Sequence, residues 1–224
     1  MIIDMHVHTQ ASGDSSATVD KYCRLIRRYR EGHSFHGLVI TEHGLYDQHA
    51  PYQKIAEKFD VLILQGVEVD TNLGHLLLYG VTSGFLKKIE VSRRNLDSQK
   101  VIKTINDCGG IAVPAHPFRS SVFGRTLAKG EINREEVSII EELNGNSSEE
   151  ANKKATGLIE QAGLKGIGGS DAHFANRGWF LNCATEFERT ISTMEALVKE
   201  LRSGPFRAIA LDPSSPEGDW PGPP

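Results

Sequence analysis

The chain has 224 residues, 39% of them hydrophobic and 7% aromatic, which supplies one sizeable core but not two full domains. Lys and Arg total 25 against 29 Asp and Glu, and the net charge of -4 excludes a globally basic surface that would hold nucleic acid without sequence preference. No apolar run approaches the roughly 18 residues that cross a bilayer, and the acidic, histidine-containing start is unlike a secretory signal. We therefore expect a cytoplasmic protein with no membrane partner.

Short apolar segments of strand length alternate along the chain with longer segments whose apolar residues recur at helical spacing. The expected strands, in chain order, cover 2–5, 37–41, 61–67, 111–114, 138–143, 166–169 and 206–211. The expected helices cover 19–30, 52–59, 98–108, 149–162 and 190–202. Most of the strand segments are apolar on both faces, which is typical of buried parallel strands. The pattern predicts one α/β domain over 1–212, a closed or nearly closed barrel of about seven strands.

Three segments depart from this alternation. The apolar run at 75–81 predicts an added strand that returns after a turn at 72–74. The segment 117–129 contains two arginines and two phenylalanines among Gly and Ser, a composition typical of lids and binding loops. The segment 213–224 is rich in Pro, Gly and Ser and is expected to be a disordered tail.

Histidines and carboxylates follow several of the expected strands at their carboxyl ends. These residues are Asp4, His6 and His8 at the first strand, His43, Glu68 and His116 at later ones, and Asp171 with His173 after 166–169. In an α/β barrel the carboxyl ends of the strands converge on one mouth, where active sites of this architecture are built. Imidazoles and carboxylates without thiolates suit divalent metals such as zinc, manganese or iron. The three cysteines are scattered and are expected to be inert core thiols.

Six short motifs occur in a fixed order: DMHVHT at 4–9, TEH at 41–43, GVEVD at 66–70, GH at 74–75, AHP at 115–117 and SDAH at 170–173. Together they resemble the polymerase and histidinol phosphatase (PHP) family, and the resemblance covers residues 1 to about 210. It implies a distorted (β/α)7 TIM-like barrel that binds up to three divalent metal ions at the carboxyl ends of its strands. It also implies a hydrolase that acts on phosphoesters.

The resemblance implies three sets of metal ligands, with Glu68 shared by two of them. The first set is His6, His8, Glu68 and Asp171; the second is Glu68, His75 and His116; the third is Asp14, His43 and His173. Glu68, Asp171 and His173 are thereby also candidate catalytic residues. For the third set, Ser12 and Ser15 are neighbouring alternatives to Asp14.

Other polar residues near these ligands have supporting roles in our interpretation. Strand alternation turns Glu42 away from the face of Thr41 and His43, which favours a role behind the ligands. Asp4 and Asp70 are expected to orient ligand imidazoles rather than to bind metal. Asn144, at the end of the fifth expected strand, is equally consistent with a substrate contact and with a turn. We expect His33, His36 and His49 to be ordinary surface residues.

Charge arithmetic favours an anionic substrate. Three divalent ions bring about +6 and the carboxylates of Asp14, Glu68 and Asp171 about -3, leaving an excess of about +3. We predict a phosphoesterase in which a metal-activated hydroxide attacks phosphorus, with Arg119 and Arg177 as phosphate contacts and Arg125 of lesser importance. The expected substrate is a phosphorylated small molecule or a nucleotide or oligonucleotide end, and no dedicated protein partner is evident.

Two alternative functions remain open. A metal-dependent amidohydrolase of related architecture would direct a similar hydroxide at carbon. The lack of a lysine on a middle strand that could be carbamylated weighs against it. A PHP accessory domain without catalysis is the other alternative, and the complete ligand set weighs against that.

Overall fold

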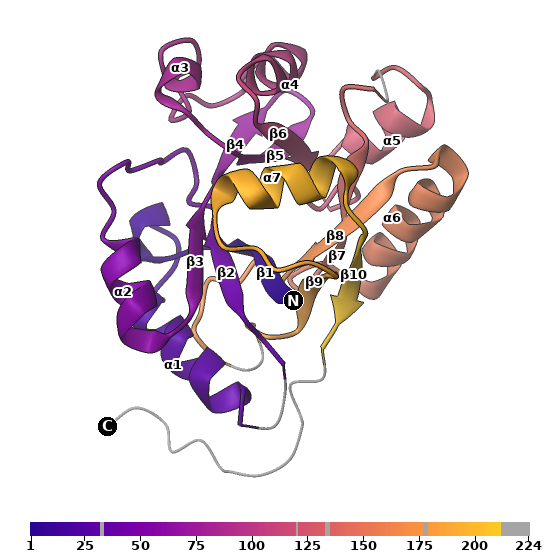
Figure 1. Ribbon diagram of the computed structural model, residues 1–224. Helices are drawn as coiled ribbons and strands as arrows, with labels where there is room; N and C mark the ends of the chain where they lie inside the picture. Colours follow the sequence, from indigo (N-terminus) through magenta and orange to yellow (C-terminus); the bar gives the residue numbers. More distant parts are fainter. Residues whose placement is uncertain (32–33, 120, 133–134, 177–178, 212–224) are drawn as a thin grey trace.

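Strands and helices alternate along the chain in the computed structural model, which describes residues 1–31, 34–119, 121–132, 135–176 and 179–211 (Figure 1). The strands are β1 (Ile2–Val7), β2 (Gly37–Ile40), β3 (Leu62–Gln65), β4 (Val67–Thr71), β5 (Gly74–Tyr79), β6 (Ile111–Pro114), β7 (Ile139–Asn144), β8 (Lys165–Gly169), β9 (Cys183–Phe187) and β10 (Phe206–Ala210). The helices are α1 (Val19–Tyr29), α2 (Tyr52–Phe59), α3 (Ser83–Leu86), α4 (Ser98–Asp107), α5 (Phe123–Ala128), α6 (Glu149–Ala162) and α7 (Met194–Ser203), with a short 3-10 helix η1 (Gln10–Ser12). His33, Arg177 and the expected tail at 213–224 lie outside the described residues.

The helices begin where a polar side chain caps the first turn. Thr18, Asp97, Ser148 and Thr193 each accept a hydrogen bond from the backbone N–H three residues further on. Because Thr193 is the cap, α7 begins at Met194 rather than at the expected 190.

Hydrogen bonds organise the described strands into three open sheets, with the orders β10-β9-β1-β2-β3, β4-β5-β6 and β7-β8. The pairs β1-β2, β2-β3 and β7-β8 are parallel, and the other pairs are antiparallel. The mixed α/β class is therefore confirmed. The added strand after the turn at 72–74 is also confirmed, because β5 pairs with β4 across a tight hairpin.

The closed or nearly closed TIM-like barrel of about seven strands is not confirmed, because the described strands form open sheets that include antiparallel pairs. The expected strand at 61–67 is divided at Gly66 into β3 and β4, which belong to different sheets. A Cβ on Gly66 would lie 2.8 Å from the carbonyl oxygen of Leu78, so only glycine fits at this step between sheets. The last strand, β10, runs antiparallel to β9, a strand that the sequence analysis missed.

Buried polar side chains occupy the joints between the sheets. Asp4 Oδ1 accepts the Ser170 N–H at 2.8 Å, and Glu141 Oε2 accepts the His116 N–H at 2.7 Å. Each side chain thus satisfies a backbone N–H that lies just beyond the end of a described strand. Two isolated parallel bridges, Val7 with Ala172 and His43 with Glu68, connect the sheets beside the candidate site.

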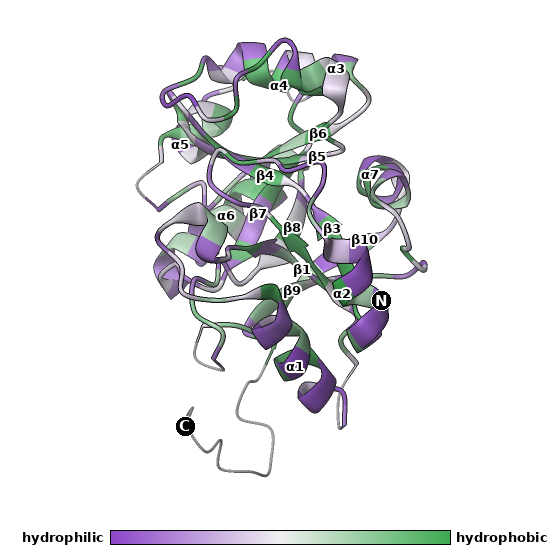
Figure 2. Ribbon diagram, turned by 90° about the vertical axis from the view of Figure 1, so that its left-hand side faces the viewer, coloured by the Kyte–Doolittle hydropathy of each residue, from purple (hydrophilic) through white to green (hydrophobic). Residues whose placement is uncertain are grey.

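Buried hydrophobic residues form three clusters, and one of them lies between the strands and is covered by α7. Figure 2 shows hydrophobic residues concentrated on the strands and hydrophilic ones on helices such as α1. The residues of that cluster come from seven strands and α7: Ile3, Met5, Val39, Leu64, Leu77, Tyr79, Val113, Ile139, Ile167, Leu197 and Leu201. This packing fixes the strands relative to one another and leaves their carboxyl ends to polar residues. Among the described residues, no helix combines the length and apolarity needed to span a membrane.

The buried Tyr22 hydroxyl ties the carboxyl end of β1 to the segment after β8. It donates to the carbonyl oxygens of His8 (2.9 Å) and Ala172 (2.8 Å). We predict that Tyr22→Phe lowers the free energy of unfolding by about 1–3 kcal/mol, because the substitution removes a hydrogen-bond donor from two backbone carbonyl oxygens. Urea titration measures the change. Tyr52→Phe is the control, since that hydroxyl bonds to no described residue; an equal effect of both substitutions would contradict the assignment.

Candidate metal centre

The structure gathers the predicted ligand residues around one point at the carboxyl ends of the strands. His6 lies on β1 and His8 directly follows it, and the alternation of an extended chain directs both side chains to the same face. The other members come from β4, β5 and the segments after β2, β6 and β8: Glu68, His75, His43, His116, Asp171 and His173.

The carboxylate of Glu68 is the hub of this group. Its side chain is 1% exposed, and each of its two oxygens contacts more than one imidazole. The Oε2 atom lies 3.0–3.2 Å from His6 Nε2, His8 Nε2 and His43 Nδ1, and the Oε1 atom lies 2.8 Å from His75 Nδ1 and 3.1 Å from His116 Nε2.

The first ligand set has the spacing of a coordination shell. His6 Nε2 and His8 Nε2 lie 2.9 Å apart, and both lie 3.1–3.4 Å from Glu68 Oε2 and Asp171 Oδ1. Four ligands around an ion at about 2.0–2.1 Å are about 3.3 Å from one another. All four side chains are buried, so water cannot separate these groups. The residues therefore fit a divalent cation.

Electrostatics at this set also favour a positive charge. Burial opposes protonation of His6, but the carboxylates of Asp171, Glu141 and Glu68 outweigh it and hold the pKa of His6 well above its ordinary value. Burial likewise opposes protonation of His8, yet hydrogen bonds to Asp171 and Glu68 raise its pKa to about 9. A divalent cation would supply the charge that the carboxylates otherwise draw onto these rings.

The second and third sets are also brought together. His75 and His116 both contact Glu68 Oε1, and His116 Nδ1 is buried without a hydrogen-bond partner in the described structure. Asp14 Oδ2 lies 3.3 Å from His43 Nε2 and 3.4 Å from His173 Nε2.

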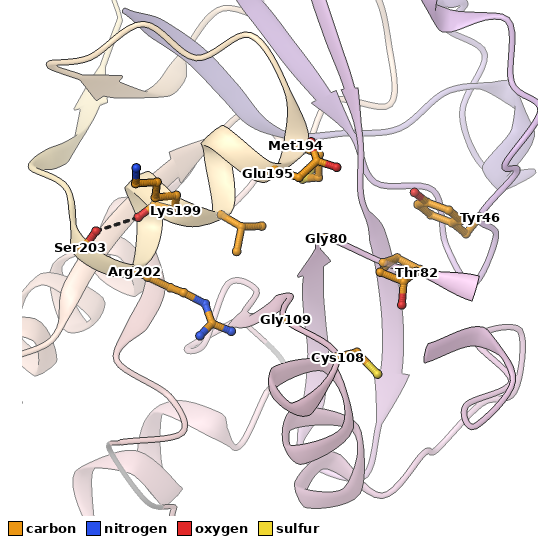
Figure 3. A pocket seen from close by; sticks show the side chains of 12 residues that line it. Tyr46, Gly80, Thr82, Cys108, Gly109, Met194, Glu195, Lys199, Arg202 and Ser203 are labelled. Carbon is orange, nitrogen blue, oxygen red and sulfur yellow. Dashed lines mark hydrogen bonds between the residues drawn. The ribbon is translucent and has the colours of Figure 1, made fainter. Parts of the chain in front are cut away.

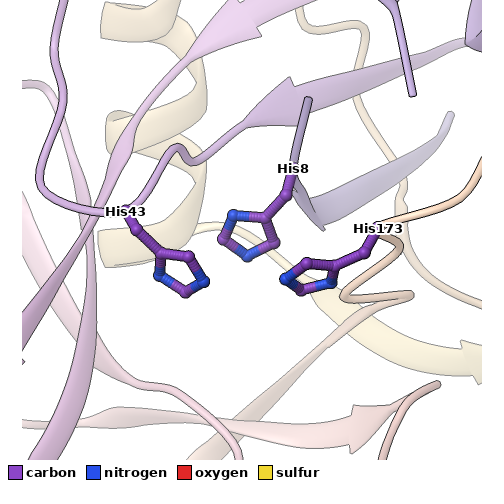
Figure 4. A group of neighbouring side chains, drawn as sticks. All are labelled: His8, His43 and His173. Carbon is purple, nitrogen blue, oxygen red and sulfur yellow. The ribbon is translucent and has the colours of Figure 1, made fainter. Parts of the chain in front are cut away.

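Figure 4 shows the histidine rings of the third set together with His8. The ring centroid of His8 lies 4.2 Å from that of His43 and 4.4 Å from that of His173. Their nitrogens are close enough to one another to hold a metal ion. His8 thus lies between the first and third sets.

Two of these residues have strained backbones. His116 has φ 30° and Asp171 has φ 52°, values in the left-handed region that residues with a Cβ seldom adopt. Such conformations cost about 1–3 kcal/mol each and persist where the surrounding structure enforces them, often at functional sites. Here the ring of His116 contacts Glu68, and the carboxylate of Asp171 contacts His6 and His8.

Two protein families match the sequence. The PHP domain matches residues 4–116, and the PHP-associated family matches residues 149–205. The chain belongs to the PHP family. A search among curated proteins finds no match.

Three solved structures share the PHP fold of this chain at low sequence identity. An amidohydrolase from Chromobacterium violaceum, with bound sulfate and no metal, has 16% identity and a TM-score of 0.59 over 95% of this chain and 98% of its own. Endonuclease Q, in complex with a 27-mer duplex carrying an abasic lesion at the active site, has 19% identity and a TM-score of 0.64 over 95% of this chain and 60% of its own. A protein from Bifidobacterium adolescentis, provisionally described as a metal-dependent phosphoesterase, has 14% identity and a TM-score of 0.55 over 79% of this chain and 88% of its own. At these identities the likeness shows the fold alone.

The sequence analysis missed Glu141, which belongs to the candidate metal centre. Its Oε1 lies 3.0 Å from His6 Nδ1, and its Oε2 accepts the His116 N–H. A carboxylate in this place fixes the ring orientation of a ligand histidine. The signal in the sequence was a charged residue within the apolar strand at 138–143.

The expected roles of Asp4 and Asp70 are wrong. Asp4 Oδ1 accepts the N–H groups of His6 and Ser170, so it holds backbone rather than a ring, and burial raises its pKa to about 7. Asp70 Oδ1 accepts the Asn95 N–H at 3.3 Å. Glu141 makes the contact to an imidazole that we had assigned to these two residues.

Glu42 supports the ligands from behind. It accepts hydrogen bonds from the hydroxyls of Thr9 and Ser12. Ser12 Oγ in turn lies 3.2 Å from His8 Nδ1 and accepts the His43 N–H at 3.0 Å. In this arrangement Glu42 acts through Ser12 on two ligand residues.

Arg119 and Asn144 contact the side of Asp171 that faces away from the histidines. Arg119 Nη2 donates to Asp171 Oδ2 at 2.6 Å, and its Nη1 donates to Asn144 Oδ1 and to the Asn146 carbonyl. Asn144 Nδ2 donates to Glu141 Oε2 and to Asp171 Oδ2. The amide of Asn144 is therefore part of the hydrogen-bond network of the centre and also supports the turn that follows β7.

Two pockets open beside the PHP centre. One, of about 360 Å³, is lined by His75, His116 and Arg119 among others. The other, of about 500 Å³, is lined by Asp14, His43 and Glu68 together with Arg93 and Arg94, two arginines that the sequence analysis did not place at the mouth. A third cavity, of about 550 Å³, lies beside α7 and is lined by residues such as Tyr46, Cys108 and Lys199 but by none of the predicted ligands (Figure 3).

Loss of the Glu68 charge should disturb two ligand sets together. We predict that Glu68→Gln removes more bound metal than Asp14→Asn does, because the half-exposed Asp14 contacts only His43 and His173 among the predicted ligands. Both variants are incubated with Mn²⁺ or Zn²⁺ and desalted. Plasma mass spectrometry then measures the metal content of each variant. A Glu68→Gln protein with wild-type metal content would contradict the shared role.

Glu141 should act through His6. We predict that Glu141→Gln weakens metal affinity about 10–100-fold, as is usual when the partner of a ligand histidine is lost. The control is Glu142→Gln, because Glu142 contacts Thr156 on α6 rather than a histidine. A competitive titration with a fluorescent chelator measures both affinities, and equal affinities would remove Glu141 from the centre.

Proposed function

We propose that this PHP protein is a metal-dependent phosphoesterase that binds up to three divalent ions of zinc, manganese or iron. The observation that carries the proposal is the buried carboxylate of Glu68, whose two oxygens contact five imidazoles drawn from all three proposed ligand sets. The ligands would be His6, His8, Glu68 and Asp171 for one ion, His75 and His116 with Glu68 for a second, and Asp14, His43 and His173 for a third.

Bound divalent ions lower the pKa of water to near neutrality and polarise a phosphoryl oxygen, so no serine or cysteine nucleophile is needed. The residues of the chain itself support an anionic substrate. The additional carboxylate of Glu141 and the guanidinium of Arg119 have opposite charges, so they leave the estimated excess of about +3 unchanged. A phosphate monoester dianion would offset most of that excess, whereas a neutral amide would not.

Arg119 is placed to hold a phosphate at the centre. It lines the same pocket as His75 and His116, and its side chain is 30% exposed. Its hydrogen bonds to Asp171, Asn144 and Asn146 use three of the five N–H groups of a guanidinium. The remaining two can bind two phosphate oxygens at once, which a lysine cannot match in geometry.

The amidohydrolase alternative receives support from the Chromobacterium violaceum neighbour. No lysine is among the described residues that line the two pockets beside the centre. In the sequence we judged this alternative by whether a lysine could be carbamylated and bridge the centre. Such a bridge would require a lysine in one of these pockets.

Metal-stripped protein reloaded with Mn²⁺ or Zn²⁺ tests the proposal directly. We expect it to hydrolyse p-nitrophenyl phosphate or bis-p-nitrophenyl phosphate, and to leave p-nitroacetanilide intact. Activity should disappear with a chelator and return with metal. Hydrolysis of the anilide alone would favour the amidohydrolase, and metal binding without any turnover would favour an accessory domain.

Arg119→Ala should lower kcat/KM for the preferred phosphate ester by about tenfold or more, the effect of losing a charged hydrogen bond of about 1.5–3 kcal/mol. Arg125→Ala is the matched control, since Arg125 is exposed on α5 and lines neither pocket beside the centre. Metal content is measured in both variants, because Arg119 also touches Asp171. An unchanged kcat/KM in Arg119→Ala would exclude it as a phosphate contact.

A further inference from the structure

Two adjacent arginines face the metal centre from a segment with no assigned role. Arg93 and Arg94 lie between α3 and α4, and both line the 500 Å³ pocket whose wall includes Glu68, His43 and His75. Neither residue belongs to a PHP motif noted in the sequence. Both lie within residues 4–116, which the PHP domain matches, and outside residues 149–205, which the PHP-associated family matches.

The segment that carries these arginines is fastened at both ends to backbone next to the ligands. On one side, Gly44 follows the ligand His43, and a Cβ on Gly44 would lie 3.0 Å from the Val91 carbonyl oxygen and 3.1 Å from Ser92 Cα. On the other side, Leu96 pairs with Thr71 at the end of β4, and its N–H donates to the Asp70 carbonyl at 3.0 Å. The backbone on either side of the arginines is therefore held beside the centre.

The pocket of this pair also contains the carboxylates of Asp14, Glu68 and Asp70, but within the described structure neither arginine forms an ion pair with them. Arg93 and Arg94 are both exposed and form no ion pair with a described residue. Other arginines do so: Arg119 pairs with Asp171, Arg207 with Glu186 and Arg30 with Asp60. Two unpaired guanidinium groups on the wall of a pocket make a strong site for a phosphate group, since each can donate several N–H bonds in a planar arrangement.

The arginine pair and Arg119 line different pockets. The pocket of Arg119 and the pocket of Arg93 and Arg94 share Asp70 and His75, so the two pockets meet at the metal centre. Arg119 would hold the phosphate that is hydrolysed at the centre. The arginine pair would then be available to bind a different group of the same substrate.

We infer that Arg93 and Arg94 form a subsite for a second phosphate group of the substrate, separate from the phosphate that is hydrolysed. The inference rests on the proposed phosphoesterase function for the identity of the first phosphate. It makes the preferred substrate a molecule with two phosphate groups, either a small bisphosphate or a phosphorylated nucleotide chain. Both kinds of molecule carry the second phosphate group that the subsite would recognise.

Equilibrium binding of ligands that cannot be hydrolysed tests the subsite without depending on turnover. Metal-loaded protein is titrated calorimetrically with propane-1,3-diylbisphosphonate and with propylphosphonate. The wild type should bind the bisphosphonate about tenfold or more tightly than the monophosphonate, well above the about twofold statistical advantage of two equal ends. The Arg93→Ala/Arg94→Ala variant should lose this preference and keep its affinity for the monophosphonate.

The control variant is Lys87→Ala/Lys88→Ala. It removes two positive charges from exposed residues of the same segment that do not line the pocket, and it should keep the preference for the bisphosphonate. An equal loss in both variants would show a diffuse effect of charge and overturn the subsite. A wild-type preference of only about twofold, or a preference that survives in the arginine variant, would overturn it as well.

Turnover then identifies the source of the second phosphate. The kcat/KM values for propane-1,3-diyl bisphosphate and for a 5′-phosphorylated dinucleotide are compared in the wild type and the arginine variant, and the natural class is the one whose value falls about tenfold or more. A fall for neither substrate would contradict the inference. If no phosphate ester is hydrolysed at all, the proposed function fails, while the phosphonate titrations still decide whether the subsite exists.

Discussion

The buried carboxylate of Glu68 is the constraint on which the rest of this structure depends. A charged group removed from water costs several kcal/mol unless partners compensate it, and breaking such an arrangement by removing one partner is strongly destabilising. Here five imidazoles from β1, β5 and the segments after β1, β2 and β6 converge on its two oxygens. Each of these segments must therefore present its histidine at the same point. A divalent cation would meet the opposing demands of the buried carboxylates and the buried rings together.

The described strands do not form one continuous ladder around this carboxylate. Where the sheets meet, the side chains of Asp4 and Glu141 accept backbone N–H groups, and Glu141 uses its other oxygen to hold the ring of His6. The backbones of His116 and Asp171 adopt left-handed conformations nearby. The strained backbones and the buried polar side chains thus occur at the end of the strands where the candidate site lies. The hydrophobic cluster under α7 fixes the strands themselves.

The sequence predicted the features that depend on local order along the chain. Strand alternation and the positions of strand ends placed His6, His8, His116 and Asp171 at one mouth, and the turn before β5 was read from its residues. It did not predict features that depend on pairing between distant segments. The break at Gly66, the antiparallel β9 and β10, the contact of Glu141 with His6, and the approach of Arg93 to the centre all need the three-dimensional arrangement. The only signal for Glu141 in the sequence was a charged residue within an apolar strand, and Arg93 had no distinguishing pattern, because the residues that they approach are far away along the chain.

The most direct test of the account is the anomalous diffraction of crystals grown with Mn²⁺ or Zn²⁺. The account predicts one ion between His6, His8 and Asp171 and another beside His75 and His116, with one oxygen of Glu68 within about 2.0–2.3 Å of each ion. Two ions that share this carboxylate would establish it as the bridge of the centre. Ions bound to the histidines with both Glu68 oxygens outside coordination distance, or no ion at this end of the strands, would contradict the central role that we give to Glu68.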